Sequence, residues 1–271
     1  MELFAVELVI FNVMVTVLQI VFVLGLIVLI TLFVFEIRIK DILLLPDNYK
    51  ILLNDYVKFY QQLDEEEKRK FEDRIQQFLS AVRITGVNAE VEDMDRVFIG
   101  AAAIIPVYSF PDWQYVNLHE VLVYPGTFNQ DFDQAGWDRF ISGMVGSGAM
   151  QHVMIISKWQ LRQGFINNSD THNTAIHEFV HLIDKMDGTM DGIPEIILER
   201  RYISQWVNIM NATIQQMRTY GSDINMYGAT NSVEFFAVVS EYFFERPDLL
   251  KASHPELYRM LEKIFLRKEI S

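Results

Sequence analysis

Two histidines flank a glutamate in residues 177–181, which read His-Glu-Phe-Val-His, the pattern H-E-x-x-H. On a helix, His177 and His181 are four positions apart, so both imidazoles leave the same face. Two neutral imidazoles at that spacing can share one zinc ion. The carboxylate of Glu178 then lies beside the metal, where it can take a proton from activated water and pass it to a leaving amine. The alternative is a helix that carries two surface histidines and a glutamate by chance.

A third ligand is required, because a catalytic zinc site combines three protein ligands with an open position for water. Cysteine is absent from the chain, which leaves histidines and carboxylates as donors. Glu234 is embedded in apolar sequence, and a buried carboxylate needs a partner that a zinc ion would supply. The alternative is a capping box, since Asn231 stands three residues before Glu234.

Further carboxylates and a phenol stand near these candidates in the sequence. Glu241 shares a helix face with Glu234, so it is either a hydrogen-bond acceptor for a ligand imidazole or a buried salt-bridge partner. Asp184 and Asp187 are further acceptor candidates, with exposed helix acids as the alternative. Tyr227 precedes Glu234 by seven residues, and a phenol there either hydrogen-bonds the oxyanion of a tetrahedral intermediate or is an aromatic residue of the core.

The remaining histidines are considered as ligands as well. His172 lies five residues before His177 on an expected loop, where it either lines the site or is an ordinary loop histidine. His119 and His152 flank expected strands and are interpreted as structural or exposed. His254 sits in a Ser-His-Pro-Glu-Leu turn, where the sequence favours an N-capping role.

The elements around these residues follow from hydrophobic periodicity. Residues 41–85 carry apolar residues at helical spacing, and Gly86 is expected to end the last of these helices. The helix with the two histidines is expected to stop at Gly188, and the later glutamate-bearing helix to begin at Asn231 or Ser232. The other expected elements are buried strands at 120–128 and 152–159, a glycine-rich turn between them at 136–150, and a small-residue helix at 97–110. The chain from residue 41 onward is therefore expected to be one compact α+β domain.

An uncharged apolar run covers residues 8–35. A helix of this length spans more than the roughly 30 Å hydrocarbon core of a bilayer. A cleaved signal peptide would have a basic start and a shorter apolar core, whereas only acidic residues precede this run. A buried core helix is the other alternative. Arg38, Lys40 and Lys50 follow the run, so the positive-inside rule places the residues from 36 onward in the cytoplasm.

Composition narrows the function classes. Acidic residues number 36 against 23 basic ones, a formal net charge of -13, which is a poor match for a protein that binds a phosphate backbone. The absence of cysteine excludes disulfides, thiolate metal sites and a thiol nucleophile. Hydrophobic residues make up 51% of the chain, and the excess is concentrated in the apolar run.

Several motifs occur in a fixed order: HEFVH with LIDKMDG, then DGIPE, then YGAT-x-x-x-EFFA-x-x-SE-x-FFE. Together with VLVYPGTF, ISKW and HPELYRML, they resemble the Mlc titration factor A (MtfA) family of zinc-dependent peptidases, which are of the gluzincin type. The resemblance covers about residues 45–265. It implies the following site: His177, His181 and Glu234 bind one zinc ion, Glu178 is the general base, and Tyr227 stabilises the transition state.

The sequence thus predicts a gluzincin-like α+β zinc metallopeptidase domain at 37–271, preceded by a transmembrane segment at 1–36. The expected function is that of a membrane-anchored, cytoplasm-facing peptidase that holds one Zn2+ per chain, with aminopeptidase activity as one variant. Its expected partners are a peptide or protein substrate and the lipid bilayer, without direct binding of nucleic acid. The alternative is a regulatory binding module that sequesters a transcriptional regulator at the membrane, with weak or vestigial peptidase activity. A third interpretation, an accessory subunit of a transporter, predicts no metal.

Overall fold

The computed structural model describes residues 14–31, 45–135, 138–167 and 171–266 of the 271-residue chain. Contacts divide the chain into two units, Met1–Leu43 and Leu44–Ser271.

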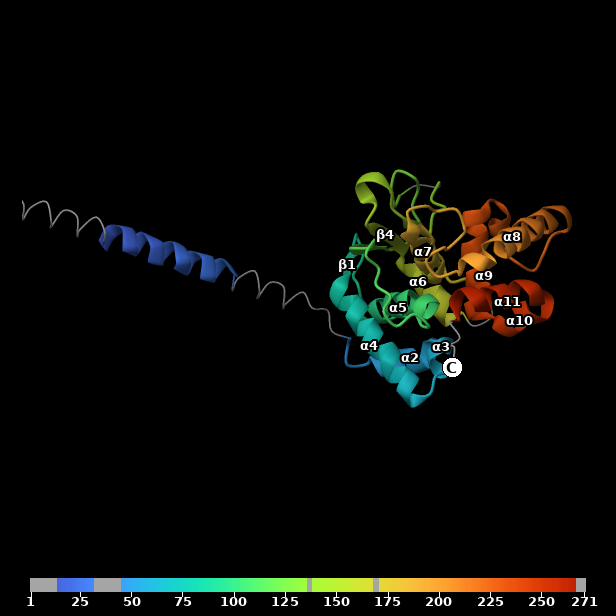
Figure 1. The fold of residues 1–271 in the computed structure, drawn as a ribbon, viewed down its shortest axis with the longest axis horizontal. Coiled ribbons are helices and arrows are strands. Elements are labelled where there is room, and N and C mark those ends of the chain that lie inside the picture. The colour runs from blue at the N-terminus through green and yellow to red at the C-terminus, as the bar shows by residue number, and fades with distance from the viewer. Residues whose placement is uncertain (1–13, 32–44, 136–137, 168–170, 267–271) are drawn as a thin grey trace, which may run out of the picture. The chain divides into compact units, whose positions relative to one another are not determined.

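The first unit contains an apolar helix, Met14–Thr31, drawn in blue in Figure 1. It has 18 residues and a mean hydropathy of 2.7, and none of its residues is buried. By length and composition, this helix is apolar enough to cross a membrane. The two ends of the predicted 8–35 run lie outside the described residues, and so do Arg38 and Lys40.

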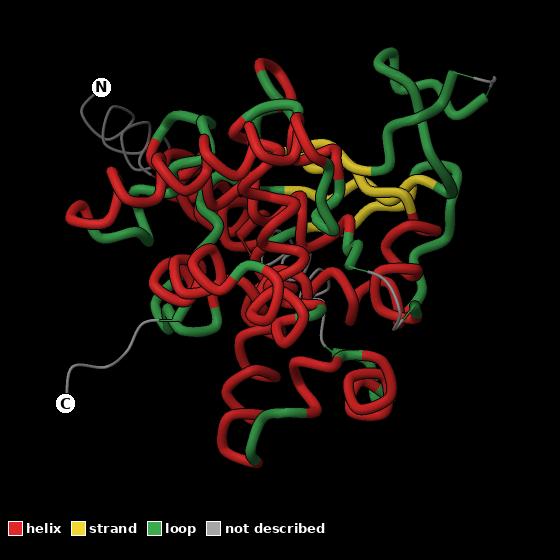
Figure 2. Tube along the Cα trace, turned by 90° about the vertical axis from the view of Figure 1, so that its right-hand side faces the viewer, coloured by secondary structure: helices red, strands yellow, loops and turns green. Residues whose placement is uncertain are grey.

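A four-stranded sheet lies in the second unit and is drawn in yellow in Figure 2. Its strands are β1 (Arg83–Gly86), β2 (Glu120–Tyr124), β3 (Gly143–Val145) and β4 (Val153–Ser157), in the spatial order β1-β2-β4-β3. The strands β1, β2 and β4 run parallel, with Ile84 opposite Val121 and Val121 opposite Met154. Strand β3 pairs antiparallel with β4 at the edge of the sheet. Strand β4 is buried from Met154 to Ser157, whereas β2 alternates at its start and β1 is buried only at Ile84.

Two strands agree with the sequence pattern, and a third replaces part of a predicted helix. Strands β2 and β4 lie within the predicted segments 120–128 and 152–159. The helix predicted to continue to Gly86 ends at Ala81, and β1 follows it. The reason is non-local, because Ile84 is β-branched, buried and held in a parallel pair with β2.

Strand β3 is the other element that differs from the prediction. The glycine-rich stretch 136–150 is expected to be a turn, yet Gly143–Val145 pairs with residues 154–156 of β4. A three-residue strand that begins with glycine carries almost no alternation of apolar and polar residues. The sequence pattern therefore gives no sign of it.

Helices form most of the second unit, which makes it a mixed α+β fold as predicted (Figure 1). They are α2 (Tyr49–Tyr56), α3 (Lys58–Gln61), α4 (Glu65–Ala81), α5 (Asp93–Ile104), α6 (Lys158–Ile166), α7 (Thr174–Asp184), α8 (Arg200–Tyr220), α9 (Ser232–Glu245), α10 (Pro247–Ser253) and α11 (Pro255–Phe265), with short 3-10 turns that include η4 (Met226–Ala229). Helices α4, α6 and α7 contact the sheet. The predicted small-residue helix is α5, which begins earlier than residue 97 and ends before Pro106.

Helices α7 and α9 pack against each other inside this unit. Phe179 on α7 and Phe235 on α9 have no exposed surface. Trp206 of α8 packs on Phe235 and donates its indole N–H to the backbone oxygen of Gly192, in the loop after α7. Gly188, with a φ of 101°, takes the left-handed turn that ends this helical stretch, as predicted. Burial on all sides explains why α9 is apolar around most of its surface.

Candidate metal centre

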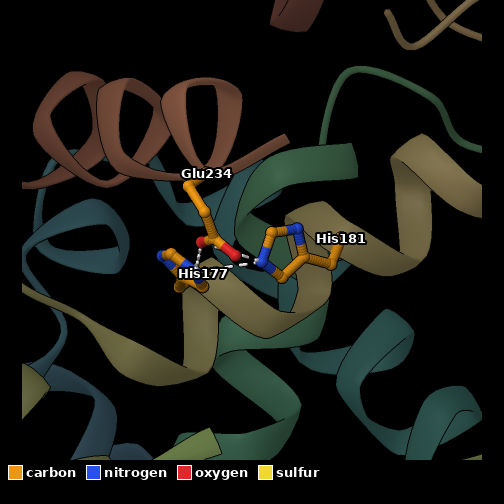
Figure 3. Close-up of side chains that lie close together, drawn as sticks. All are labelled: His177, His181 and Glu234. Atoms are coloured by element: carbon orange, nitrogen blue, oxygen red, sulfur yellow. Dashed lines mark hydrogen bonds and ion pairs between the residues drawn. The ribbon is translucent and has the colours of Figure 1, made fainter. Parts of the chain in front are cut away.

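Three polar side chains from α7 and α9 meet at one point, drawn in Figure 3. His177 and His181 leave the same side of α7, and Glu234 lies in the first turn of α9. The Nε2 atoms of the two imidazoles lie 3.0 Å apart. The Oε2 atom of Glu234 is 3.0 Å from Nε2 of His177 and 3.5 Å from Nε2 of His181. One ligand atom from each residue is thus available within 4.8 Å of the others, a spacing at which the three can hold one metal ion.

A buried carboxylate sets the orientation of His177. The Oε1 atom of Glu241 lies 2.7 Å from Nδ1 of His177, and Glu241 is only 3% exposed. Because an ionised carboxylate only accepts hydrogen bonds, Nδ1 carries a proton, and Nε2 is the ring nitrogen that faces the cluster. Glu241 thus accepts a hydrogen bond from an imidazole of the cluster, and the same contact is a buried ion pair when His177 is protonated, so both interpretations of Glu241 apply.

The electrostatics of the cluster favour a positive charge at its centre. Burial lowers the pKa of His177, but Glu241 and Glu234 outweigh burial and raise this pKa to about 10. Burial raises the pKa of Glu234, whereas the hydrogen bonds from the two imidazoles hold it well below its usual range. The centre of the cluster, where Nε2 of both imidazoles meets Oε2 of Glu234, is therefore a place that a positive charge stabilises, either a proton on Nε2 of His177 or a metal ion. Imidazole nitrogens and a carboxylate oxygen are donors that fit a divalent transition metal.

Asn173 is the N-cap residue of α7 and forms hydrogen bonds to several neighbouring segments. Its side-chain oxygen accepts the backbone N–H of Ile176, which caps the helix. Its own backbone N–H donates to Oε2 of Glu241 at 2.7 Å. Its side-chain amide donates to Oε1 of Glu245 at 2.9 Å and to the backbone oxygen of Gly164. One fully buried asparagine thus fixes both the start of α7 and the carboxylate that orients His177.

Glu178 follows His177 along the chain and points toward β3. It is 4% exposed, and burial raises its pKa against the opposing effect of the two imidazoles. Its Oε2 atom has no hydrogen-bond partner among the described residues. Gly143 on β3 makes room for this side chain, because a Cβ there would lie 2.5 Å from Oε1 of Glu178. An acidic group with one unsatisfied oxygen therefore stands beside the cluster.

Tyr227 lies on η4, at the accessible side of the cluster. It is 53% exposed, and its ring centroid is 6.1 Å from that of His177. Burial of part of the ring, together with Glu234 and Glu178, raises the pKa of Tyr227 to about 12. Asn225 is the N-cap of η4, and its side-chain oxygen accepts the Tyr227 N–H at 2.9 Å. A neutral phenol thus stands close to the cluster and in reach of solvent.

The two aspartates predicted as further acceptors pair elsewhere. Asp184 is buried, which raises its pKa to about 7, and its Oδ2 atom accepts the backbone N–H of Gly192 at 2.9 Å. Asp187 accepts hydrogen bonds from Thr189. Within the part of the chain that the structure describes, Nδ1 of His181 has no hydrogen-bond partner, so neither aspartate orients this imidazole.

His172 lies next to the cluster, as one of its two interpretations expects. Its Nε2 atom is 2.7 Å from the side-chain nitrogen of Asn225. Its Nδ1 atom is 3.7 Å from Oε2 of Glu241. The ring therefore stands between the residue that caps the tyrosine turn and the carboxylate that orients His177.

The other three histidines have partners elsewhere. The rings of His119 and His152 stack with centroids 4.4 Å apart, in keeping with a structural role. His254 stands at the start of α11 without a capping hydrogen bond, and its Nε2 atom is 2.6 Å from Oδ1 of Asp223. His254 is thus the N-cap residue of α11, as predicted, but its side chain pairs with Asp223 and does not cap the helix. The proline that begins α11 lacks a backbone N–H, so this helix start has one donor fewer to satisfy.

The start of α9 resolves two alternatives. Asn231 is the N-cap, and its side-chain oxygen accepts the Glu234 N–H at 2.9 Å, so Ser232 is the first helical residue. In a capping box, the Glu234 carboxylate would turn back to the backbone of Asn231. It points instead to the two imidazoles (Figure 3).

Three residues around the cluster were not among the sequence candidates. Asn173 and Asn225 carry a recognisable signal, because an asparagine just before a helical segment is typical of an N-cap. Gly143 carries none, since its importance comes from the close approach of β3 to Glu178. Such an approach between distant segments has no local signature.

The chain resembles known proteins over most of its length. The sequence profile of the glucose-regulated metallo-peptidase M90 family matches residues 38–266. An uncharacterized protein of Synechocystis sp. is 32% identical over 243 residues, which cover 82% of this chain and 84% of that protein. Mlc titration factor A of Pectobacterium atrosepticum is 32% identical over 219 residues, which cover 75% of this chain and 80% of the relative. The Escherichia fergusonii protein of the same name is 28% identical over 219 residues, with the same two coverages.

These similarities agree with the chemistry of the site. A metallopeptidase family implies a metal ion, and the chain contains a cluster of two histidines and a glutamate that fits one. The resemblance drawn from the motifs is confirmed, and the chain belongs to the glucose-regulated metallo-peptidase M90 family.

Proposed function

We propose that this protein is a membrane-anchored, zinc-dependent peptidase of the gluzincin type. The zinc ligands are His177, His181 and Glu234, and the residues that act on the substrate are Glu178 and Tyr227. The observation that carries the proposal is the convergence of three donor atoms within 4.8 Å, in a chain of a metallopeptidase family. Imidazole and carboxylate donors suit zinc, and three protein ligands leave a coordination position open.

Glu178 is the proton carrier in this proposal. When bound, the ion supplies Lewis acidity, which acidifies water and polarises a carbonyl group. The unpartnered Oε2 atom of Glu178 accepts a proton from the attacking water and returns it to the nitrogen of the leaving amine. Burial raises the pKa of this carboxyl group, which favours the protonated form that the second transfer needs.

Tyr227 is proposed to donate a hydrogen bond to the oxygen of the scissile carbonyl group. Its pKa of about 12 keeps the phenol protonated at neutral pH, as a donor must be. A donor aimed at an oxygen that gains charge stabilises the transition state more than the substrate. The half-exposed position of Tyr227 leaves it accessible to an incoming peptide.

Strand β3 offers a place for the peptide backbone. The Ser157 N–H donates to the oxygen of Ser142, and the Gly146 N–H donates to the oxygen of Val153. Because hydrogen-bonded and non-bonded pairs alternate in antiparallel strands, the backbone groups of Gly143 and Val145 point away from β4. We propose that an extended peptide pairs with this outer edge, which lies beside Glu178.

The membrane anchor is a separate part of the proposal. Helix Met14–Thr31 supports it through its mean hydropathy of 2.7 and its unburied side chains. We propose that residues 1–36 anchor the chain and that residues 37–271 form the peptidase domain in the cytoplasm. Fractionation tests this assignment: the chain should stay in membranes after a high-salt wash with its N-terminus intact. Recovery of a soluble chain cleaved after residue 31 would identify a signal sequence instead.

Metal analysis and peptide hydrolysis by the full-length protein test the proposed activity. We expect one zinc ion per chain in the wild type and none in His177→Ala. The variant His119→Ala is the matched control, because this imidazole stacks on His152 and should leave the zinc content unchanged. Replacement Glu178→Gln should retain zinc and reduce hydrolysis by about 10²- to 10⁴-fold. Hydrolysis at the wild-type rate in Glu178→Gln would contradict the role of Glu178 as the proton carrier.

Capture of a regulatory protein is the second candidate, suggested by the name that several relatives carry, Mlc titration factor A. For this chain, the candidate would gain support if the folded protein bound no zinc after the metal was added. A complete set of two histidines, a glutamate and a free carboxylate favours the peptidase, since a purely binding surface needs none of them.

A further inference from the structure

We propose that His172 is a positioning residue that holds the Tyr227 turn in place beside the metal cluster. This inference rests on the proposed function, in which the phenol of Tyr227 meets the substrate. His172 precedes the two-histidine helix in sequence and is separated from Asn225 by 53 residues. The fold brings the two side chains together, and no local pattern requires them to meet.

The first link runs from His172 to the tyrosine turn through Asn225. The side-chain nitrogen of Asn225 lies 2.7 Å from Nε2 of His172. The side-chain oxygen of the same asparagine accepts the Tyr227 N–H at 2.9 Å. An amide with its oxygen bound to the turn has its nitrogen free to donate to the ring. The imidazole thus fixes which way the capping amide of η4 faces.

The second link runs from His172 to the buried side of the site. Its Nδ1 atom faces Oε2 of Glu241 at 3.7 Å. This separation is longer than a hydrogen bond, so the contact is electrostatic. A proton on Nδ1, the nitrogen that faces the carboxylate, leaves Nε2 as the acceptor that Asn225 requires. The same carboxylate holds His177 through its other oxygen. His172 therefore lies between the tyrosine turn and the buried carboxylate that orients His177.

The turn is also attached to the rest of the domain at other points: Ile224 just before it is buried, and so are Gly228 and Ala229 within it. Arg218 of α8 holds the far end of η4 by donating to the backbone oxygens of Ala229 and Thr230 at 2.7 and 2.9 Å. Tyr227 itself is 53% exposed and is not packed in the core. The contact between Asn225 and His172 therefore acts on the exposed part of the turn that carries Tyr227, and it bridges this part to the cluster.

A fluorine label on the tyrosine tests this role without reference to turnover. The full-length protein carries 3-fluorotyrosine at position 227, in detergent micelles and loaded with zinc. We expect His172→Ala to move the fluorine resonance toward that of free fluorotyrosine and to narrow it. His172→Gln should keep the wild-type resonance, since a glutamine carbonyl can accept from Asn225. An unchanged resonance in His172→Ala would overturn the proposal.

The control for the label is His119→Ala, which removes a histidine with a stacking partner elsewhere and should leave the resonance unchanged. Zinc affinity supplies a second check. Because His172 acts on the turn, His172→Ala should bind zinc as tightly as the wild type does. A large loss of zinc affinity would instead assign His172 to the orientation of the metal ligands and overturn the proposal.

Turnover of a fluorogenic peptide completes the test. His172→Ala should lower kcat by about 10- to 100-fold with little change in KM, because misplacement of a donor by about 1 Å has effects of this size. In a Tyr227→Phe background, the same substitution should lower kcat less than about twofold, since the group that His172 positions is gone. Equal effects in both backgrounds would overturn the proposal. If the wild type hydrolyses no peptide, the proposed function fails, and the fluorine spectrum still decides the role of His172.

Discussion

The two sides of the candidate site are built differently. On one side, α7 and α9 hold His177 and Glu241 almost entirely buried, and Asn173 fixes both helix and carboxylate with hydrogen bonds. On the other side, η4 presents Tyr227 at 53% exposure and Met226 at 48%. Metal ligands must be placed before the ion arrives, whereas a group that meets the substrate must stay accessible. The contrast therefore predicts that metal retention and turnover can be separated by mutation.

The largest separation is expected for Tyr227→Phe. Removal of the hydroxyl leaves the ring and the turn in place but deletes the donor to the developing oxyanion. We expect kcat to fall by about 10²- to 10³-fold, with zinc content and zinc affinity unchanged. Single-turnover hydrolysis of a fluorogenic peptide, with zinc measured on the same sample, gives both quantities.

The matched control for this substitution is Tyr220→Phe. Tyr220 ends α8 and is 85% exposed, so loss of its hydroxyl should change neither quantity. If Tyr227→Phe lost zinc together with activity, the tyrosine turn would be part of the metal-holding side, and the contrast between the two sides would disappear.

The buried side should respond in the opposite way. In Glu241→Gln, the negative charge that raises the pKa of His177 is lost and the imidazole is held less firmly. We expect zinc affinity to fall by about 10- to 100-fold, measured by competition with a chromogenic chelator. At saturating zinc, kcat should recover most of its wild-type value. Asp187→Asn is the control, because this exposed acid pairs with Thr189 and should leave the affinity unchanged.

The contrast also explains what the sequence could predict. The placement of His177 and His181 on one helix face is local, since four residues set it. The approach of Glu234 follows from its apolar surroundings and from the resemblance to a known family. Strands β2 and β4 could be predicted because each lies in a long apolar run, and the structure confirms both.

The remaining features depend on segments that are far apart in the chain. Strand β1 replaces a predicted helix because of its pairing with β2, and β3 is too short to show a pattern. His172 and Asn225 meet across 53 residues, and Glu241 reaches His177 across 64. Side-chain contacts of this kind are set by the packing of α7, α9 and η4, and no single stretch of sequence encodes them.

The next prediction concerns Glu245, a largely enclosed acid that accepts a hydrogen bond from Asn173. Burial raises the pKa of Glu245 to about 7, against the opposing effects of Asn173 and Lys58. Because the folded pKa lies above the unfolded value of 4.5, folding favours the protonated form. This stabilisation is fully present below about pH 4.5 and is lost as the pH rises through about 7. At pH 8 the charged Glu245 thus destabilises the fold by about 1–3 kcal/mol.

The substitution Glu245→Gln should therefore raise Tm at pH 8, with a difference from the wild type that shrinks toward zero as the pH falls to about 4.5. Thermal unfolding across this range measures it. Glu195→Gln, which removes an exposed glutamate of a loop, should give curves that follow the wild type. A Glu245→Gln variant that is less stable at pH 8 would show that the ion pair with Lys58 outweighs the burial of the acid.

The smallest expected effect is a difference in stability between variants of two asparagine caps, one on each side of the site. Asn231 caps α9 and Asn225 caps η4, each by accepting one backbone N–H at 2.9 Å. Loss of the cap in Asn231→Ala should lower the free energy of unfolding by about 1 kcal/mol, because a buried helix depends on it. Asn225→Ala should change that free energy much less, because η4 is a single short turn that buried Gly228 and Ala229 and the hydrogen bonds of Arg218 also hold. Chemical denaturation measures both, and Asn231→Asp, which keeps the acceptor, should retain wild-type stability. Equal destabilisation by both alanine variants would mean that the tyrosine turn belongs to the cooperative core, and that the accessible side of the site is no looser than the buried one.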